Sequence, residues 1–181
     1  VRLTTELDEA DGVVVCEVAP DPYRGAVGGE IVLDVAGHAA RATLDAQGRA
    51  RLTLRLPGVA PWFPATHGAP ALHEARVTLD GRVIEARRLG FRRVEIDRDA
   101  DGEGFGFVVN GVPVFARGAV WVPPDLLRLP DAPEALRPQL EAMVAAHMNM
   151  VRVAGPFFPE SRAFYDLCDE LGLMVWQDFA F

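Results

Sequence analysis

Hydrophobic and polar residues alternate along the first half of the chain. Glu30-Ile-Val-Leu-Asp-Val35 and Ala50-Arg-Leu-Thr-Leu-Arg-Leu56 alternate with a period of two, which predicts strands that bury one face. The remaining strands predicted in this half are residues 13–18, 72–79 and 90–96. Turn signals separate the strands at Gly28-Gly29, Gln47-Gly48, Pro57-Gly58 and Asp80-Gly81. Short strands with such turns predict an immunoglobulin-like β-sandwich over residues 1–97.

A polar segment, Asp97-Arg-Asp-Ala-Asp-Gly102, interrupts the strand pattern and predicts a solvated linker at a domain boundary. After it, the apolar runs 105–109 and 112–116 flank Asn110-Gly111. Because Asn-Gly takes positive φ at low cost, this arrangement predicts a hairpin with a type I′ turn.

The hydrophobic period then changes to that of a helix. One apolar stripe consists of Leu140, Met143, Val144 and His147, with Pro138 suited to the first turn of the helix. A second stripe consists of Phe164, Leu167, Cys168 and Leu171, with Gly172 placed as a C-terminal cap. Both stripes are expected to be core.

Three short apolar segments, residues 118–123, 148–155 and 173–178, alternate with these helices and predict a parallel sheet. Three strands cannot close a barrel of eight. We therefore expect residues 98–181 to be the hairpin and first three units of an incomplete (β/α)8 TIM barrel, and the chain to be a piece of a longer polypeptide.

Composition excludes some partners. The net charge of −8 argues against nucleic acid and anionic membrane surfaces, and no apolar run is long enough for a membrane span. The two cysteines, Cys16 and Cys168, have apolar neighbours and are expected as buried free thiols. The four histidines are scattered without metal-ligand spacing, so no metal is expected. The sequence does not indicate a cellular compartment.

Several motifs, in order, resemble glycoside hydrolase family 2, and within it the β-mannosidase-like members. They are residues 110–125, His147-Met-Asn-Met-Val-Arg-Val153, Phe164–Gly172 and Val175-Trp-Gln-Asp-Phe179. Upstream, Pro61-Trp-Phe-Pro64 and Arg88-Leu-Gly-Phe-Arg92 are similar to the end of the family's immunoglobulin-like domain.

The resemblance implies a retaining exo-β-glycosidase of carbohydrate catabolism, with a glycoside or oligosaccharide as substrate and no cofactor. Such an enzyme uses two carboxylates about 5–5.5 Å apart. In the family the acid/base Glu follows an Asn, but this chain contains no Asn-Glu pair. Both catalytic Glu residues are therefore expected beyond Phe181, and the chain is expected to be inactive without the remainder of its polypeptide.

The candidate site residues lie at the carboxyl ends of the predicted parallel strands, where barrel active sites form. Arg152 interrupts an apolar strand and is expected to face inward and pair with carboxylates. The resemblance implies a place beside the catalytic carboxylates, with a purely structural ion pair as the alternative. Asp178 is the expected counter-charge, and Trp121 and Trp176 are either an apolar wall for a sugar ring or plain core.

Gly155 follows the same strand end as Arg152. Many β-mannosidase-like sequences have Trp-Gly where this chain has Ala154-Gly155, so the resemblance leaves the sugar undecided. Asn149, near the start of the strand, is expected to serve the backbone.

Two other functions remain open. One is a non-catalytic carbohydrate-binding or scaffolding β-sandwich module, although the apolar chain end would then leave an exposed patch and an unpaired strand edge. The other is an inactive glycosidase relative that retains sugar binding.

Overall fold

The computed structural model describes residues 1–20, 28–125, 127–128, 131–155 and 159–179. The fold is mostly β, and the chain divides into two compact units. The first unit comprises Val1–Pro61 and Leu72–Arg93, and the second comprises Trp62–Ala71 and Val94–Phe181. Neither helix in the described part of the chain is long and apolar enough to cross a bilayer.

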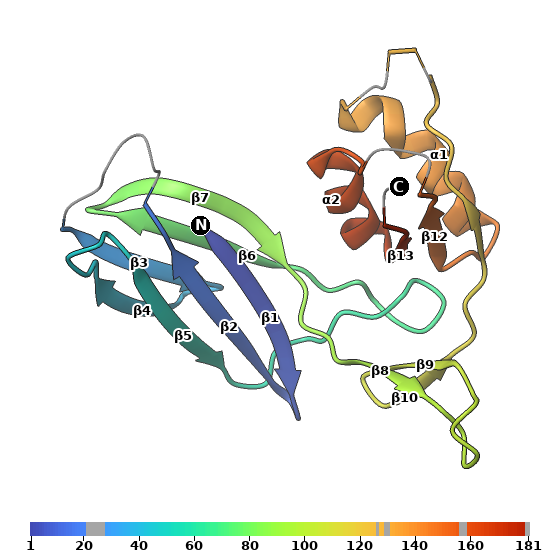
Figure 1. Ribbon diagram of the computed structural model, residues 1–181, viewed down its shortest axis with the longest axis horizontal. Helices are drawn as coiled ribbons and strands as arrows, with labels where there is room; N and C mark the ends of the chain where they lie inside the picture. Colours follow the sequence, from blue (N-terminus) through green and yellow to red (C-terminus); the bar gives the residue numbers. More distant parts are fainter. Residues whose placement is uncertain (21–27, 126, 129–130, 156–158, 180–181) are drawn as a thin grey trace. The chain divides into compact units, whose positions relative to one another are not determined.

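Two antiparallel sheets form the first unit (Figure 1). The three-stranded sheet has the order β1-β2-β5, with bounds Arg2–Asp8, Asp11–Val18 and Ala50–Leu56. The four-stranded sheet has the order β4-β3-β6-β7, with bounds His38–Thr43, Glu30–Val35, His73–Leu79 and Arg82–Leu89. The strands predicted at 30–35 and 50–56 are confirmed.

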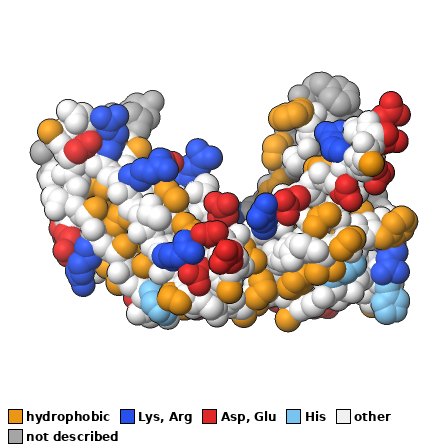
Figure 2. Space-filling model, turned by 90° about the horizontal axis from the view of Figure 1, so that it is seen from below, with side chains coloured by type: hydrophobic (Ala, Val, Ile, Leu, Met, Phe, Trp, Pro, Cys, Tyr) orange, Lys and Arg blue, Asp and Glu red, His pale blue; other side chains and the backbone are white. Residues whose placement is uncertain are grey.

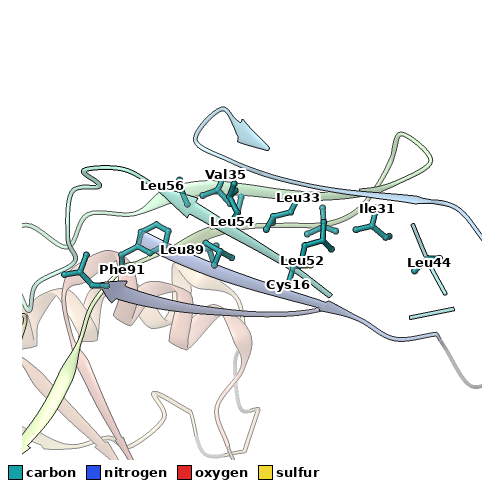
Figure 3. Packing of buried hydrophobic residues seen from close by; sticks show 14 residues of the cluster. Cys16, Ile31, Leu33, Val35, Leu44, Leu52, Leu54, Leu56, Leu89 and Phe91 are labelled. Carbon is teal, nitrogen blue, oxygen red and sulfur yellow. The ribbon is translucent and has the colours of Figure 1, made fainter. Parts of the chain in front are cut away.

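The two sheets share one hydrophobic core, to which each contributes its alternating apolar positions. In β3 the buried side chains are Ile31, Leu33 and Val35, and in β5 they are Leu52, Leu54 and Leu56. Figure 3 shows these side chains pointing into one layer. The period-two pattern thus places every second side chain of both strands out of water.

The strand predicted at 90–96 is wrong in extent. β7 ends at Leu89, and a new strand, β8, runs over Val94–Asp97. Between them Phe91 is fully buried in the core of the first unit, and the carbonyl of Gly90 accepts a hydrogen bond from Thr5 Oγ1 at 2.9 Å. Phe91 is apolar because it fills the core, without belonging to a strand.

The second unit begins with an antiparallel sheet of order β10-β9-β8, in which β9 is Gly106–Val109 and β10 is Val112–Val114. The predicted Asn-Gly hairpin is confirmed, with φ of 51° at Asn110 and 78° at Gly111. The polar segment 97–102 lies in the turn between β8 and β9 instead of forming a linker. Its carboxylates close the turn, since those of Asp97 and Asp101 accept backbone N–H groups two residues on.

A parallel sheet of order β11-β12-β13 follows, with bounds Gly118–Val120, Met150–Val153 and Met174–Gln177. The helices α1 (Pro133–Ala145) and α2 (Arg162–Leu171) alternate with these strands and pack together (Figure 1). Their buried side chains join those of β12 in a second core cluster. The predicted order of strands and helices is confirmed.

The two helices differ in how well the sequence predicted their ends. α1 begins at Pro133, so Pro138 lies inside the helix instead of in its first turn, and His147 lies beyond it with φ of 57°. His147 is exposed and does not belong to the apolar stripe. α2 is as predicted, because Gly172 is left-handed at φ 73° and its N–H bonds to the carbonyl of Cys168.

The segment Trp62–Ala71 packs within the second unit although its chain neighbours belong to the first. Trp62 is 1% exposed, and its indole N–H donates to the carbonyl of Asp169 at 2.7 Å. The amide of Ala65 donates to the carbonyl of Gly172 at 2.9 Å. Because the last carbonyls of a helix lack partners within it, these bonds complete the C-terminal end of α2.

Gly118 permits the close approach of β11 to β12. A Cβ at this position would overlap the backbone carbonyl of Met150, which cannot move without breaking the sheet. We expect Gly118→Ala, in the complete protein, to lower the free energy of local opening of these strands by about 2 kcal/mol. Hydrogen exchange of their amides measures this.

Gly106→Ala is the matched control, since a Cβ there would meet Asp97 at 3.4 Å, an ordinary contact. Equal exchange protection in wild type and Gly118→Ala would show that β11 and β12 can move apart to accommodate the added Cβ without a cost in free energy.

Candidate functional site

One face of the parallel sheet is covered by helices and the other is open. On β12, Val151 and Val153 are buried in the core formed with α1 and α2, whereas Arg152 lies on the opposite face. The register places Val120, Arg152 and Trp176 side by side across the three strands. A hollow of about 360 Å³ lies on this face and is lined mainly by apolar side chains, with Arg152 and Trp176 among them.

Arg152 and Asp178 form a two-pronged ion pair at the carboxyl ends of β12 and β13. Nε of Arg152 lies 3.2 Å from Oδ1 of Asp178, and Nη2 lies 2.7 Å from Oδ2. The amide of Asp178 donates to the carbonyl of Val153 at 3.0 Å, so the parallel pairing itself brings the two side chains together. A planar guanidinium held at two points has a fixed direction.

The surroundings of Asp178 keep its carboxylate ionised. Hydrogen bonding to Arg152 is the largest cause of its lowered pKa, and the backbone N–H of Gly155, 3.4 Å away, and the side chain of Trp176 act in the same direction. A lowered carboxyl pKa stabilises the fold above the group's usual value, and that contribution is lost only as pH falls through the lowered value. Asp178 is thus a permanent anion at neutral pH, unsuited to carry a proton.

The two tryptophans lie in different surroundings. Trp176 is 42% exposed on the open face, with its ring centroid 6.0 Å from that of Phe105 and 6.3 Å from that of Phe107. Trp121 is 1% exposed within the helix-side core, 4.8 Å from Phe164 between ring centroids. The structure therefore gathers Arg152, Asp178, Gly155 and Trp176, and leaves Trp121 apart from them.

Sequence reasoning missed three polar residues that bond near the carboxyl ends of these strands: Glu160, Tyr165 and Gln177. The carboxylate of Glu160 accepts the indole N–H of Trp121 at 2.9 Å. The hydroxyl of Tyr165 donates to the Gln177 side chain at 2.8 Å. Each bond joins residues from different elements, and no spacing or motif in the sequence signals such contacts.

The side chain of Asn149 hydrogen-bonds to the backbone, as predicted. It is fully buried, and its side-chain oxygen accepts the amide N–H of Arg117 at 2.9 Å. Its side-chain nitrogen donates to the carbonyl of Phe115 at 3.0 Å and to Oγ1 of Thr66 at 2.8 Å. These bonds fix the chain that enters β11 and join it to the Trp62–Ala71 segment.

Acidic and basic side chains are interspersed on the surface shown in Figure 2. In the described ranges, no three His, Cys, Asp or Glu side chains gather as a metal site would need. Cys16 and Cys168 are buried free thiols, as predicted, and burial raises the pKa of both. Neither thiol is therefore a ready nucleophile.

The arrangement can orient a polar group and cannot by itself perform acid/base catalysis. Within the gathered residues the single carboxylate is Asp178, which is tied to Arg152. Asp178 occupies Nε and one N–H of Nη2, so three of the five guanidinium N–H groups are not used by this pair. These donors suit a carboxylate or sugar hydroxyl brought in by other parts of a protein.

Comparisons with known proteins agree on one enzyme class. A β-mannosidase B from Aspergillus flavus is 35% identical over 192 residues, which take in 100% of this chain and 21% of that protein. The crystal structure of a β-D-mannosidase from Dictyoglomus thermophilum aligns with a TM-score of 0.78 and 32% identity, over 94% of this chain and 22% of the other.

An exo-chitosanase from Amycolatopsis orientalis shares the fold, with a TM-score of 0.74 and 24% identity over 99% of this chain and 22% of the other. No family model matches the chain. The chain spans about a fifth of the length of these relatives.

Proposed function

We propose that this chain, which belongs to the β-mannosidase-like members of glycoside hydrolase family 2, works within a complete retaining exo-β-glycosidase. The observation that carries the proposal is the match to β-mannosidase B over the whole of this chain. Its support from the structure is the oriented Arg152–Asp178 pair at the carboxyl edge of the parallel sheet.

The proposed architecture is an immunoglobulin-like sandwich followed by the first three units of a (β/α)8 barrel. Two antiparallel sheets around one core support the sandwich. Parallel strands alternating with helices, covered on one face and open on the other, support the barrel. We place the division near residue 97; the compact units separate at Arg93 and Val94, with Trp62–Ala71 in the second.

In this proposal the chain orients, and the remainder of the polypeptide supplies the chemistry. Retaining hydrolysis needs a nucleophilic carboxylate and an acid/base carboxylate about 5–5.5 Å apart. Arg152 is proposed to hold one of them ionised through its free donors, with Asp178 fixing its direction. Trp176 is proposed to supply an apolar wall for a sugar ring. Gly155 is proposed to let the substrate approach the backbone closely. The mechanism requires no metal or cofactor.

The proposed substrate is a β-linked glycoside cleaved at its non-reducing end, and β-mannosides are the first to test. Ala154 stands where many β-mannosidase-like sequences have Trp, so an aromatic surface for the terminal sugar is missing. Amino-substituted and glucose-configured β-glycosides therefore belong in the same panel.

The test is turnover by the complete protein. We expect release of nitrophenol from p-nitrophenyl β-D-mannoside, or from its β-glucosaminide or β-glucoside counterpart, with retention of configuration. The matching α-anomer is the control and should be inert. We also expect the coding sequence to contain an Asn-Glu pair and a second Glu at the ends of later barrel strands.

Sugar binding without turnover of any β-glycoside would instead favour the non-catalytic module or an inactive relative. Turnover of α- and β-anomers alike would exclude a retaining β-specific site.

A further inference from the structure

Hydrogen bonds link the carboxyl ends of the parallel strands to the loop and the helix beside them. One of them joins the end of β11 to the loop after β12, because the indole N–H of Trp121 donates to the carboxylate of Glu160 at 2.9 Å. Glu160 thus connects the end of β11 with the loop that leads into α2.

A separate set of bonds joins α2 to the end of β13. Tyr165 donates its hydroxyl to Oε1 of Gln177 at 2.8 Å, and Nε2 of Gln177 donates to the backbone carbonyl of Asp178 at 3.0 Å. Asp178 in turn makes the two-pronged pair with Arg152. Tyr165 and Gln177 therefore form a strand-end brace that leads from α2 to the ion pair.

We propose that the strand-end brace positions Asp178, and through it the guanidinium of Arg152, for the reaction. The ion pair is largely solvent-accessible on its Arg152 side, where the side chain is 54% exposed, and exposed pairs alone fix geometry weakly. The brace strengthens this weak constraint because its hydrogen bonds connect the backbone at Asp178 to packed residues on α2. Tyr165 is a positioning residue, since it lies on α2 and not on the open face.

This inference rests on the proposed function, and its test separates the two. In the complete protein, Tyr165→Phe removes the hydroxyl and keeps the ring on Phe164, whose centroid is 5.3 Å away. We expect kcat on the best p-nitrophenyl β-glycoside to fall about 10-fold with little change in KM, because sub-ångström misplacement lowers the rate of the chemical step.

A double-mutant cycle with Asp178→Asn distinguishes positioning from general weakening. If the brace acts through Asp178, adding Tyr165→Phe to the Asp178→Asn enzyme should lower kcat by less than about 2-fold. Independent effects would instead multiply, so that kcat would fall by the product of the two single losses. Asp166→Asn, on the exposed flank of the same helix in an i,i+4 pair with Arg162, is the control and should match wild type.

Hydrogen exchange supplies a readout that needs no turnover. Tyr165→Phe should speed exchange of the Asp178 amide, which bonds to Val153, while Asp166→Asn should not. Wild-type kcat in Tyr165→Phe, multiplicative losses in the cycle, or unchanged exchange at Asp178 would each overturn the brace. An inactive wild-type protein would count against the proposed function alone, and the exchange measurement would still decide the brace.

Discussion

Arg152→Ala is expected to lower kcat/KM of the complete protein for its β-glycoside about 10³-fold, the size of effect seen when a preorganised donor is removed from an active site. The guanidinium lies on the open face of the sheet and is held at two points by Asp178, and the Arg152 side chain lines the hollow on that face. Its removal takes the charged partner from both the anion of Asp178 and the group it orients. Steady-state kinetics across pH 4 to 8 measure the loss.

The substitution Arg152→Lys should recover only part of the rate, because an ammonium group cannot reproduce the two-pronged geometry. Arg137→Ala is the matched control. Arg137 also makes two ion pairs, with Glu141 at 3.4 Å and Glu170 at 2.8 Å, but on the helices. An Arg152→Ala enzyme within about 3-fold of wild type would assign Arg152 to a structural ion pair.

The pH dependence of this effect has a definite sign. The pKa of Asp178 is lowered, chiefly by Arg152, so Asp178 itself adds no pH dependence between pH 5 and 7. Removal of Arg152 should raise the pKa of the catalytic carboxylate that it is proposed to hold ionised, so the ratio of wild-type to Arg152→Ala activity should increase as pH falls from 7 to 5. A ratio that stays constant across this interval would show that Arg152 does not keep that carboxylate ionised.

Which strands could be predicted from the sequence depended on how many of their side chains are buried. The central strands β2 and β3 and the edge strand β5 bury alternate side chains and carry a clear apolar pattern. The strands missed in the first unit, β1, β4 and β7, bury at most one residue each. A strand that buries so few side chains has little reason to alternate in sequence.

The residues of the candidate site also differ in whether the sequence signals them. Arg152 and Asp178 were found because each is a charge on an apolar strand or at its end, and parallel pairing then brings them together. Glu160 and Tyr165 carry no such signal, because a Glu in a loop and a Tyr on a helix are ordinary surface residues until the tertiary fold brings them to Trp121 and Gln177. Hydrogen bonds between elements depend on loop geometry, which no local pattern encodes.

Asn149→Ala is expected to destabilise the second unit by about 3 kcal/mol, because it removes a fully buried amide and leaves part-buried backbone groups without this partner. Asn149 is fully buried and bonds the amide of Arg117, the carbonyl of Phe115 and the hydroxyl of Thr66. All three lie at the entry to β11 or in the segment Trp62–Ala71, so their loss should loosen both together. Hydrogen exchange of the Arg117 and Met150 amides in the complete protein measures the change in opening free energy.

Gln139→Ala is the matched control for this substitution. Gln139 also donates an amide N–H to a backbone carbonyl, that of Val122 at 3.2 Å, but it is exposed, so water can replace the bond. Its loss should cost less than about 0.5 kcal/mol. If Asn149→Ala cost no more than Gln139→Ala, water would have to reach the cluster around Asn149, and that cluster would not be what holds the Trp62–Ala71 segment to the parallel sheet.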